Sequence, residues 1–137
     1  MYFLGVNMMR LHHIAANVRD LEKIKAFYQA YFGAKANERY YNPKTGLKTY
    51  FLTFASGSQL EIMTRPDLAA IPGDAEHFGY VHLAFGVGDE SSVDHLTDRL
   101  RKDGYRVYSE PRRTGDGYYE SCVLDPDGNR IEIIANP

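Results

Sequence analysis

Four ionisable side chains occupy matching positions in the two halves of the chain. His13 precedes Glu61 by 48 residues, and His82 precedes Glu132 by 50 residues. Imidazole and carboxylate groups are ligands that zinc, nickel, iron and manganese accept, and a bound ion would allow two carboxylates to stay charged in one site. With two open positions, such an ion could polarise two oxygens of a substrate. The pattern leaves two interpretations open: one divalent metal site, or four separate side chains that are solvated or hydrogen-bonded.

Strand periodicity predicts that these four residues share one side of a sheet. Each stands in a run where apolar residues alternate with it, such as LEIM around Glu61 and RIEII around Glu132. Because successive side chains of a strand point to opposite faces, the ionisable residue faces away from its apolar neighbours. We expect the apolar residues to pack under helices. If the two halves pair about a pseudo-twofold axis, two imidazoles and two carboxylates converge on the other face.

An internal repeat must position these residues. Residues 11–33 have the pattern of strand, turn, helix and terminal glycine, and residues 80–104 repeat that order. In each half an aspartate follows the histidine by seven residues, at the place expected for a helix N-cap: these are Asp20 and Asp89. A repeat of this kind indicates two copies of one structural unit.

The rest of the pattern predicts an α+β fold made of two βαβββ modules, residues 11–65 and 80–137. Together they form a single domain over 11–137, after an N-terminal extension at 1–10. The further strands are expected at 36–42, 48–54, 59–64, 106–110, 118–124 and 130–135, with a polar loop at 112–117 and a tight turn at 125–129.

Composition argues against several classes of protein. The chain has 137 residues, of which 44% are hydrophobic, so it can bury the core of one domain. Sixteen basic and 18 acidic residues give a net charge of -2 without a basic block, so we expect no nucleic-acid partner. Cys122 is the single cysteine, which suits a reducing compartment. Because no segment is typical of a signal peptide or a membrane span, we expect a cytoplasmic protein with no membrane association.

At these residues the sequence resembles the vicinal oxygen chelate superfamily, which includes the glyoxalase I and bleomycin-resistance proteins. HHIAANVRDLEKIKAFYQAYFGA is similar to the opening strand and helix of that superfamily, GSQLEIM to its fourth strand, GYVHLAFGV to its fifth and VLDPDGNRIEII to its terminal hairpin. The resemblance implies two βαβββ modules that form a curved mixed sheet around a metal site, commonly within a homodimer. It also implies that four residues bind one divalent ion (Zn, Ni, Fe or Mn): His13, Glu61, His82 and Glu132.

The complete ligand set is similar to that of bacterial glyoxalase I, a metal-dependent lyase that isomerises the hemithioacetal of methylglyoxal and glutathione. The resemblance implies proton transfer through a metal-stabilised enediolate of a small α-oxygenated carbonyl substrate. Glu132 would act as base and then acid, with Glu61 as its catalytic partner. Two alternatives stay open. One is an isomerase like methylmalonyl-CoA epimerase, although those enzymes usually carry Gln where Glu61 stands. The other is a protein that sequesters a small molecule, such as an antibiotic, without turnover.

Two positions depart from the glutathione-binding pattern of glyoxalase I. That enzyme usually carries Arg four residues after the first ligand and Asn four residues after the second, whereas this chain has Asn17 and Arg65. Both share the ligand face if their strands extend that far, so we expect both to bind substrate. Arg65 could hold a carboxylate or phosphate through two hydrogen bonds, or it could be a solvent-facing charge at the end of a strand. The substrate is therefore expected to be a small molecule that need not contain glutathione.

Overall fold

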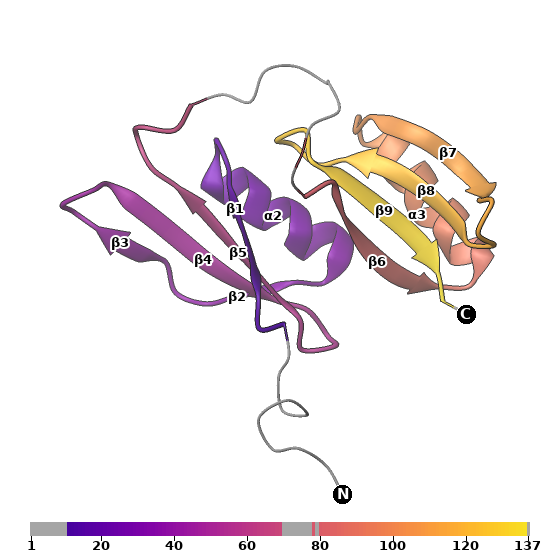
Figure 1. The fold of residues 1–137 in the computed structure, drawn as a ribbon, viewed down its shortest axis with the longest axis horizontal. Coiled ribbons are helices and arrows are strands. Elements are labelled where there is room, and N and C mark those ends of the chain that lie inside the picture. Colours follow the sequence, from indigo (N-terminus) through magenta and orange to yellow (C-terminus); the bar gives the residue numbers. More distant parts are fainter. Residues whose placement is uncertain (1–10, 70–77, 79, 137) are drawn as a thin grey trace, which may run out of the picture. The chain divides into compact units, whose positions relative to one another are not determined.

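The computed structural model describes residues 11–69, 78 and 80–136, and Figure 1 shows their two helices and nine strands. The predicted extension at 1–10 lies outside these residues. The chain divides into two compact units, Met1–Leu68 and Ala69–Pro137, which we call the first and second modules. Each module combines one helix with one sheet of mixed direction, which confirms the α+β fold class.

The first module places one helix against a five-stranded sheet. Strand order is β1-β5-β4-β2, and β3 also pairs with β4. The first strand runs parallel to β5, whereas β2, β3 and β5 are each antiparallel to β4. The elements are β1 (Ile14–Asn17), α2 (Leu21–Phe32), β2 (Lys35–Ala36), β3 (Tyr40–Asn42), β4 (Leu47–Thr53) and β5 (Gln59–Thr64).

Local chemistry fixes both ends of α2. The Asp20 side chain accepts a hydrogen bond from the main-chain N–H of Lys23 at 3.0 Å, so the predicted N-cap is confirmed. Gly33 ends the helix in the left-handed conformation at φ 67°, which costs a glycine little. Between these ends the helix buries one face of its surface through Leu21, Ile24, Phe27 and Tyr28.

The prediction of one strand over 36–42 is wrong. The structure has two short strands instead, β2 and β3, which both pair with β4. The reason is Asn37 between them: its main-chain N–H donates to the Phe51 carbonyl at 3.1 Å, and its side-chain oxygen accepts from the Phe51 N–H at 2.8 Å. The asparagine side chain thereby replaces one main-chain partner and interrupts the ladder.

The second module repeats the order with a four-stranded sheet. Strand order is β6-β9-β8-β7; β6 is parallel to β9, and the other pairs are antiparallel. The predicted loop at 112–117 starts later than expected, because Arg112 and Arg113 pair with β8 as the end of β7. The elements are β6 (His82–Gly88), α3 (Glu90–Lys102), β7 (Val107–Arg113), β8 (Tyr119–Leu124) and β9 (Arg130–Ala135).

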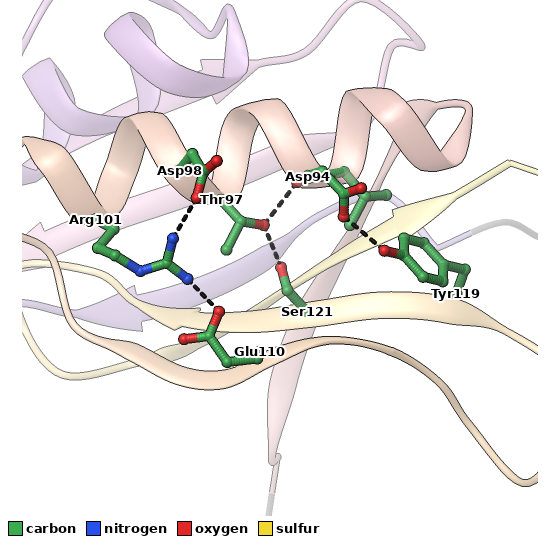
Figure 2. A network of polar contacts seen from close by, with 8 residues as sticks. Asp94, Thr97, Asp98, Arg101, Glu110, Tyr119 and Ser121 are labelled. Atoms are coloured by element: carbon green, nitrogen blue, oxygen red, sulfur yellow. Dashed lines mark hydrogen bonds and ion pairs between the residues drawn. The ribbon is translucent and has the colours of Figure 1, made fainter.

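Polar side chains attach α3 to β7 and β8 (Figure 2). The hydroxyls of Thr97 and Ser121 share a buried hydrogen bond of 2.7 Å, and the Tyr119 hydroxyl donates to Asp94 at 2.6 Å. Arg101 also forms an ion pair with Glu110 of β7. These contacts fix the helix-facing side of β8, and therefore also fix which of its residues point the other way.

Each sheet has an apolar face under its helix. Leu60, Ile62, Ile131 and Ile133 are between 0% and 4% exposed. The residues that alternate with them point to the opposite side, which we call the distal face of each module: it carries Glu61 in the first and Glu132 in the second. No helix in the described part of the chain has the length and hydropathy needed to cross a membrane.

Candidate functional site

The distal face of the first module carries a histidine and a glutamate in contact. His13 Nε2 lies 3.6 Å from Glu61 Oε1, and the two side chains are 35% and 17% exposed. The parallel pairing of β1 with β5 sets Ala15 beside Glu61. His13 precedes Ala15 by two residues and lies on the same face. The other ring nitrogen of His13 lies 2.9 Å from a ring nitrogen of His12, which leaves Nε2 directed at Glu61.

The distal face of the second module carries the same pair. His82 Nε2 lies 3.2 Å from Glu132 Oε1, with the side chains 38% and 20% exposed. Here β6 and β9 run parallel, and Ala84 stands beside Glu132. In both modules the histidine therefore lies at the start of the first strand, His13 just before β1 and His82 as the first residue of β6. The glutamate comes from the last strand, which is the direct neighbour of the first.

The turn before β9 sets the register of Glu132. Asp125 accepts hydrogen bonds from the main-chain N–H groups of Asp127 and Asn129, both at 2.9 Å. Gly128 supplies the positive φ of 87° that this turn needs. The hairpin then sets Cys122 of β8 opposite Glu132. The predicted turn at 125–129 is thus confirmed, and it determines which residues of β9 reach the distal face.

The chemistry of these donors fits a divalent transition-metal ion. Each pair offers one imidazole nitrogen and carboxylate oxygens, which suit zinc, nickel, iron and manganese. Among the residues that the structure describes, no group of three or more His, Cys, Asp or Glu side chains could hold a metal. Each module thus presents half of the expected four-residue set.

The two predicted substrate-binding residues differ in their surroundings. Asn17 is the last residue of β1, is exposed and lies on the side of His13 by alternation. Arg65 follows the end of β5 and forms an ion pair with Asp67, where Arg65 Nη2 lies 2.9 Å from Asp67 Oδ2. The hydrogen bond from Arg65 lowers the pKa of Asp67. Any substrate anion that binds Arg65 must therefore compete with an existing carboxylate.

Sequence reasoning missed two side chains on the distal face of the second module. Glu120 of β8 is only 6% exposed. Arg112 of β7 stands opposite, with its Nη2 3.8 Å from Glu120 Oε2. The alternation of side chains along a strand could have placed Glu120 on the distal face, because Ser121 and Val123 of the same strand face the helix.

Cys122 lies near this group but is a poor candidate for a nucleophile. It is 7% exposed, and burial raises the pKa of its thiol. A neutral buried thiol is a weak nucleophile, so Cys122 packs as a small apolar side chain.

Comparisons with known proteins converge on one superfamily. The family model of the glyoxalase/bleomycin resistance protein/dioxygenase superfamily matches residues 10–133. The uncharacterized protein YwkD of Bacillus subtilis is 31% identical over 125 residues, which are 90% of this chain and 94% of YwkD. The lactoylglutathione lyase of Salmonella typhimurium is 26% identical over 127 residues, 92% of each chain. The crystal structure of the fosfomycin resistance protein FosX from Listeria monocytogenes, complexed with Mn(II) and sulfate, matches with a TM-score of 0.69 and 26% identity, and covers 95% of this chain and 94% of FosX.

Proposed function

Because this chain belongs to the glyoxalase/bleomycin resistance protein/dioxygenase superfamily, we propose that it is a cytoplasmic, metal-dependent lyase or isomerase of the glyoxalase I type. It moves a proton between neighbouring carbons of a small α-oxygenated carbonyl substrate through an enediolate. One observation carries this proposal: the distal face of each module holds a histidine against a glutamate, at 3.6 Å and 3.2 Å. The lactoylglutathione lyase relative supports the reaction class, and the Mn(II) complex of FosX supports the use of a metal.

In this proposal four residues hold one divalent ion: His13, Glu61, His82 and Glu132. Two nitrogen and two oxygen donors leave room for the two vicinal oxygens of a substrate. The ion, when bound, supplies Lewis acidity toward those oxygens. The second pair of donors comes from the same chain or from a second copy. We favour a homodimer, which would also protect exposed sheet edges from aggregation.

The two carboxylates carry out the proton transfer. Glu132 removes the proton from the carbon next to the carbonyl and returns it to the neighbouring carbon, as general base and then general acid. Glu61 occupies the corresponding position in the first module and is its partner. Asn17 and Arg65 bind the polar end of the substrate, and Arg65 does so by exchanging Asp67 for a substrate carboxylate or phosphate.

The first test is the metal content per chain, measured by elemental analysis. Wild-type protein is expected to carry close to one equivalent of Ni, Zn, Fe or Mn for each four-residue set, and the variant Glu61→Ala with Glu132→Ala is expected to lose it. A matched control removes two exposed carboxylates elsewhere, by Glu38→Ala with Glu110→Ala. This control is expected to keep the metal.

The second test is turnover on a panel of substrates. It begins with the hemithioacetal of methylglyoxal and glutathione and continues with carboxylated α-hydroxy and α-keto compounds, with fosfomycin included because of the FosX relative. In D2O, exchange of the proton held by Glu132 with solvent should place deuterium at the carbon that receives the proton, in a fraction of the product. A wild type that takes up none of the four metals would contradict the proposal and leave a small-molecule binding protein as the better interpretation.

A further inference from the structure

An arginine lies beside the His82–Glu132 pair on the distal face of the second module. Arg130 precedes Glu132 by two residues on β9, so both side chains point to this face. Residues two apart on a strand are separated by about 7 Å. On the neighbouring strand β6, the residue that pairs with Arg130 is His82. Arg130 is therefore the immediate neighbour of both proposed metal donors of this module.

Tyr108 of β7 holds the Arg130 side chain from across the sheet. Val107 pairs with Val123, which is 0% exposed and faces the helix, so Tyr108 after it points to the distal face. There Arg130 Nη2 donates to the Tyr108 hydroxyl at 3.3 Å, and Arg130 Cζ lies over the Tyr108 ring, 4.8 Å from its centroid. A guanidinium group that contacts both an aromatic ring and its hydroxyl is limited in the orientations it can take.

A second arginine adds its charge to this pair. Arg106 directly precedes β7, and its Cζ lies 5.7 Å from the centroid of the same Tyr108 ring. Two guanidinium groups thus approach one ring, and Tyr108 is 44% exposed to solvent. Two positive charges attract a doubly charged anion more strongly than a singly charged one. A phosphate monoester carries about two negative charges at pH 7, whereas a carboxylate carries one.

We propose that Arg130, oriented by Tyr108 and assisted by the charge of Arg106, binds a phosphate group of the substrate. The inference rests on the proposed function and names its substrate class: a short α-oxygenated carbonyl compound with a phosphate group a few bonds from the oxygens that face the metal donors. Arg130 determines specificity, and Tyr108 is a positioning residue. The planar guanidinium fork suits phosphate oxygens. Its contact with Tyr108 uses one of five N–H donors, so phosphate can bind while that contact stays in place.

The first measurement is the affinity for inorganic phosphate, determined by isothermal titration calorimetry. It uses the protein as purified and is repeated with excess EDTA, because the arginines need no metal to bind phosphate. Arg130→Met should weaken binding by about 10-fold, the effect of losing a charge-assisted hydrogen bond. Arg130→Lys keeps the charge without the planar fork and should lie between the wild type and Arg130→Met. It also replaces Arg130→Met if that variant does not fold.

Two further variants test the role of Tyr108. Tyr108→Phe keeps the ring beside the guanidinium and loses the hydroxyl, so it should weaken phosphate binding by about 3-fold. Tyr108→Leu loses both contacts and should weaken binding more than Tyr108→Phe does. The matched control is Arg99→Met, which removes the same charge from an exposed position of α3, on the other side of the sheet. It should bind phosphate within about 2-fold of the wild type.

The second measurement connects the phosphate to the carbonyl end of the substrate. Dihydroxyacetone phosphate and dihydroxyacetone share an α-hydroxy ketone and differ in the phosphate. The wild type should bind the phosphate ester about 10-fold more tightly, and Arg130→Met should lose this preference while its affinity for dihydroxyacetone stays unchanged. Equal affinity of the wild type for the two compounds would overturn the assigned substrate class.

Other outcomes separate this inference from the proposed function. Unchanged phosphate affinity in Arg130→Met would overturn the inference and leave the proposed metal site intact. An equal loss in Arg99→Met would overturn it too, because phosphate would then respond only to net charge. Acetate that binds as tightly as phosphate would overturn the choice of a phosphate group. A wild type that carries no metal but shows Arg130-dependent phosphate binding would contradict the proposed function and support the phosphate site.

Discussion

A pair of buried hydroxyl groups connects β8 to α3. Thr97 is 1% exposed and Ser121 is 0% exposed. Thr97 Oγ1 donates to the main-chain oxygen of Val93 at 2.6 Å and shares a hydrogen bond with Ser121 Oγ at 2.7 Å. Buried polar groups are costly when they lose a partner, because water cannot replace it.

We therefore predict that Thr97→Val lowers the free energy of unfolding by about 1–3 kcal/mol, since it leaves the Ser121 hydroxyl without this partner. The double variant Thr97→Val with Ser121→Ala should lose less than the sum of the two single losses, because no unpaired hydroxyl is left. Urea denaturation of the four proteins measures this coupling. Additive losses would show that the two hydroxyls act independently.

Helix caps decide where each helix begins, and the two caps of this chain allow a comparison at the scale of elements. The Asp89 side chain accepts from the main-chain N–H of Ser92 at 2.8 Å, as Asp20 does from Lys23 in the first module. The hydrogen bonds from Ser92, first from its main chain and then from its hydroxyl, lower the pKa of Asp89. The folded state thus prefers the charged form of this cap.

Because the pKa of Asp89 is lower in the folded state than in the unfolded state, the charge of Asp89 stabilises the fold at every pH above the unfolded-state pKa of about 4. This stabilisation is lost as the pH falls through the folded-state pKa. We predict that Asp89→Asn, which caps without a charge, is less stable than the wild type at pH 7 and approaches it in stability at about pH 2–3. Asp89→Ala should be less stable than Asp89→Asn at pH 7. Thermal unfolding followed by circular dichroism between pH 2 and 7 checks both. A difference between wild type and Asp89→Asn that does not change with pH would contradict the role of the charge.

The sequence predicts elements best where the signal is local. The strands β5 and β9 begin and end at the predicted residues, because alternating apolar residues lie between strong turns. The prediction fails where a contact with a residue distant in the chain determines the bounds of an element. Asn37 breaks the expected strand through its bonds to Phe51, and cross-strand pairing draws Arg112 into β7.

The same distinction holds for the candidate site. The alternation of side chains along each strand was enough to predict that His13 and Glu61 share a face. The same alternation predicted that His82 and Glu132 share a face. The ion pair of Glu120 with Arg112 was missed because it depends on the register of β7 against β8. No spacing within one strand reports a register between two.

At the scale of the whole molecule, the proposal makes a prediction about how the two modules respond to one ion. A ligand that binds only the folded state adds about 2.7 kcal/mol of stability at 100 times its Kd. For a chain of 137 residues this corresponds to a rise in Tm of about 10 °C. We expect saturating Mn²⁺ to produce such a rise, and EDTA to reverse it.

If one ion uses both pairs, a single substitution in either module should remove the whole rise. His13→Ala and His82→Ala are therefore each expected to abolish the increase in Tm. His95→Ala, which changes an exposed histidine of α3, is the matched control and should retain it. Two independent sites would give a different result, since each histidine variant would then retain part of the rise.

The parallel pairing of first and last strands has a consequence for folding kinetics. Within each module the histidine lies at the start of the first strand and the glutamate on the last strand, and the helix and the other strands separate the two along the chain. Contacts between residues so distant along the chain form slowly, because a long loop must close first. We therefore expect each His–Glu pair to form late in the folding of its module. During synthesis both residues of the first pair are added to the chain before either residue of the second, so a nascent chain passes through a stage at which it contains only two of the four proposed metal donors.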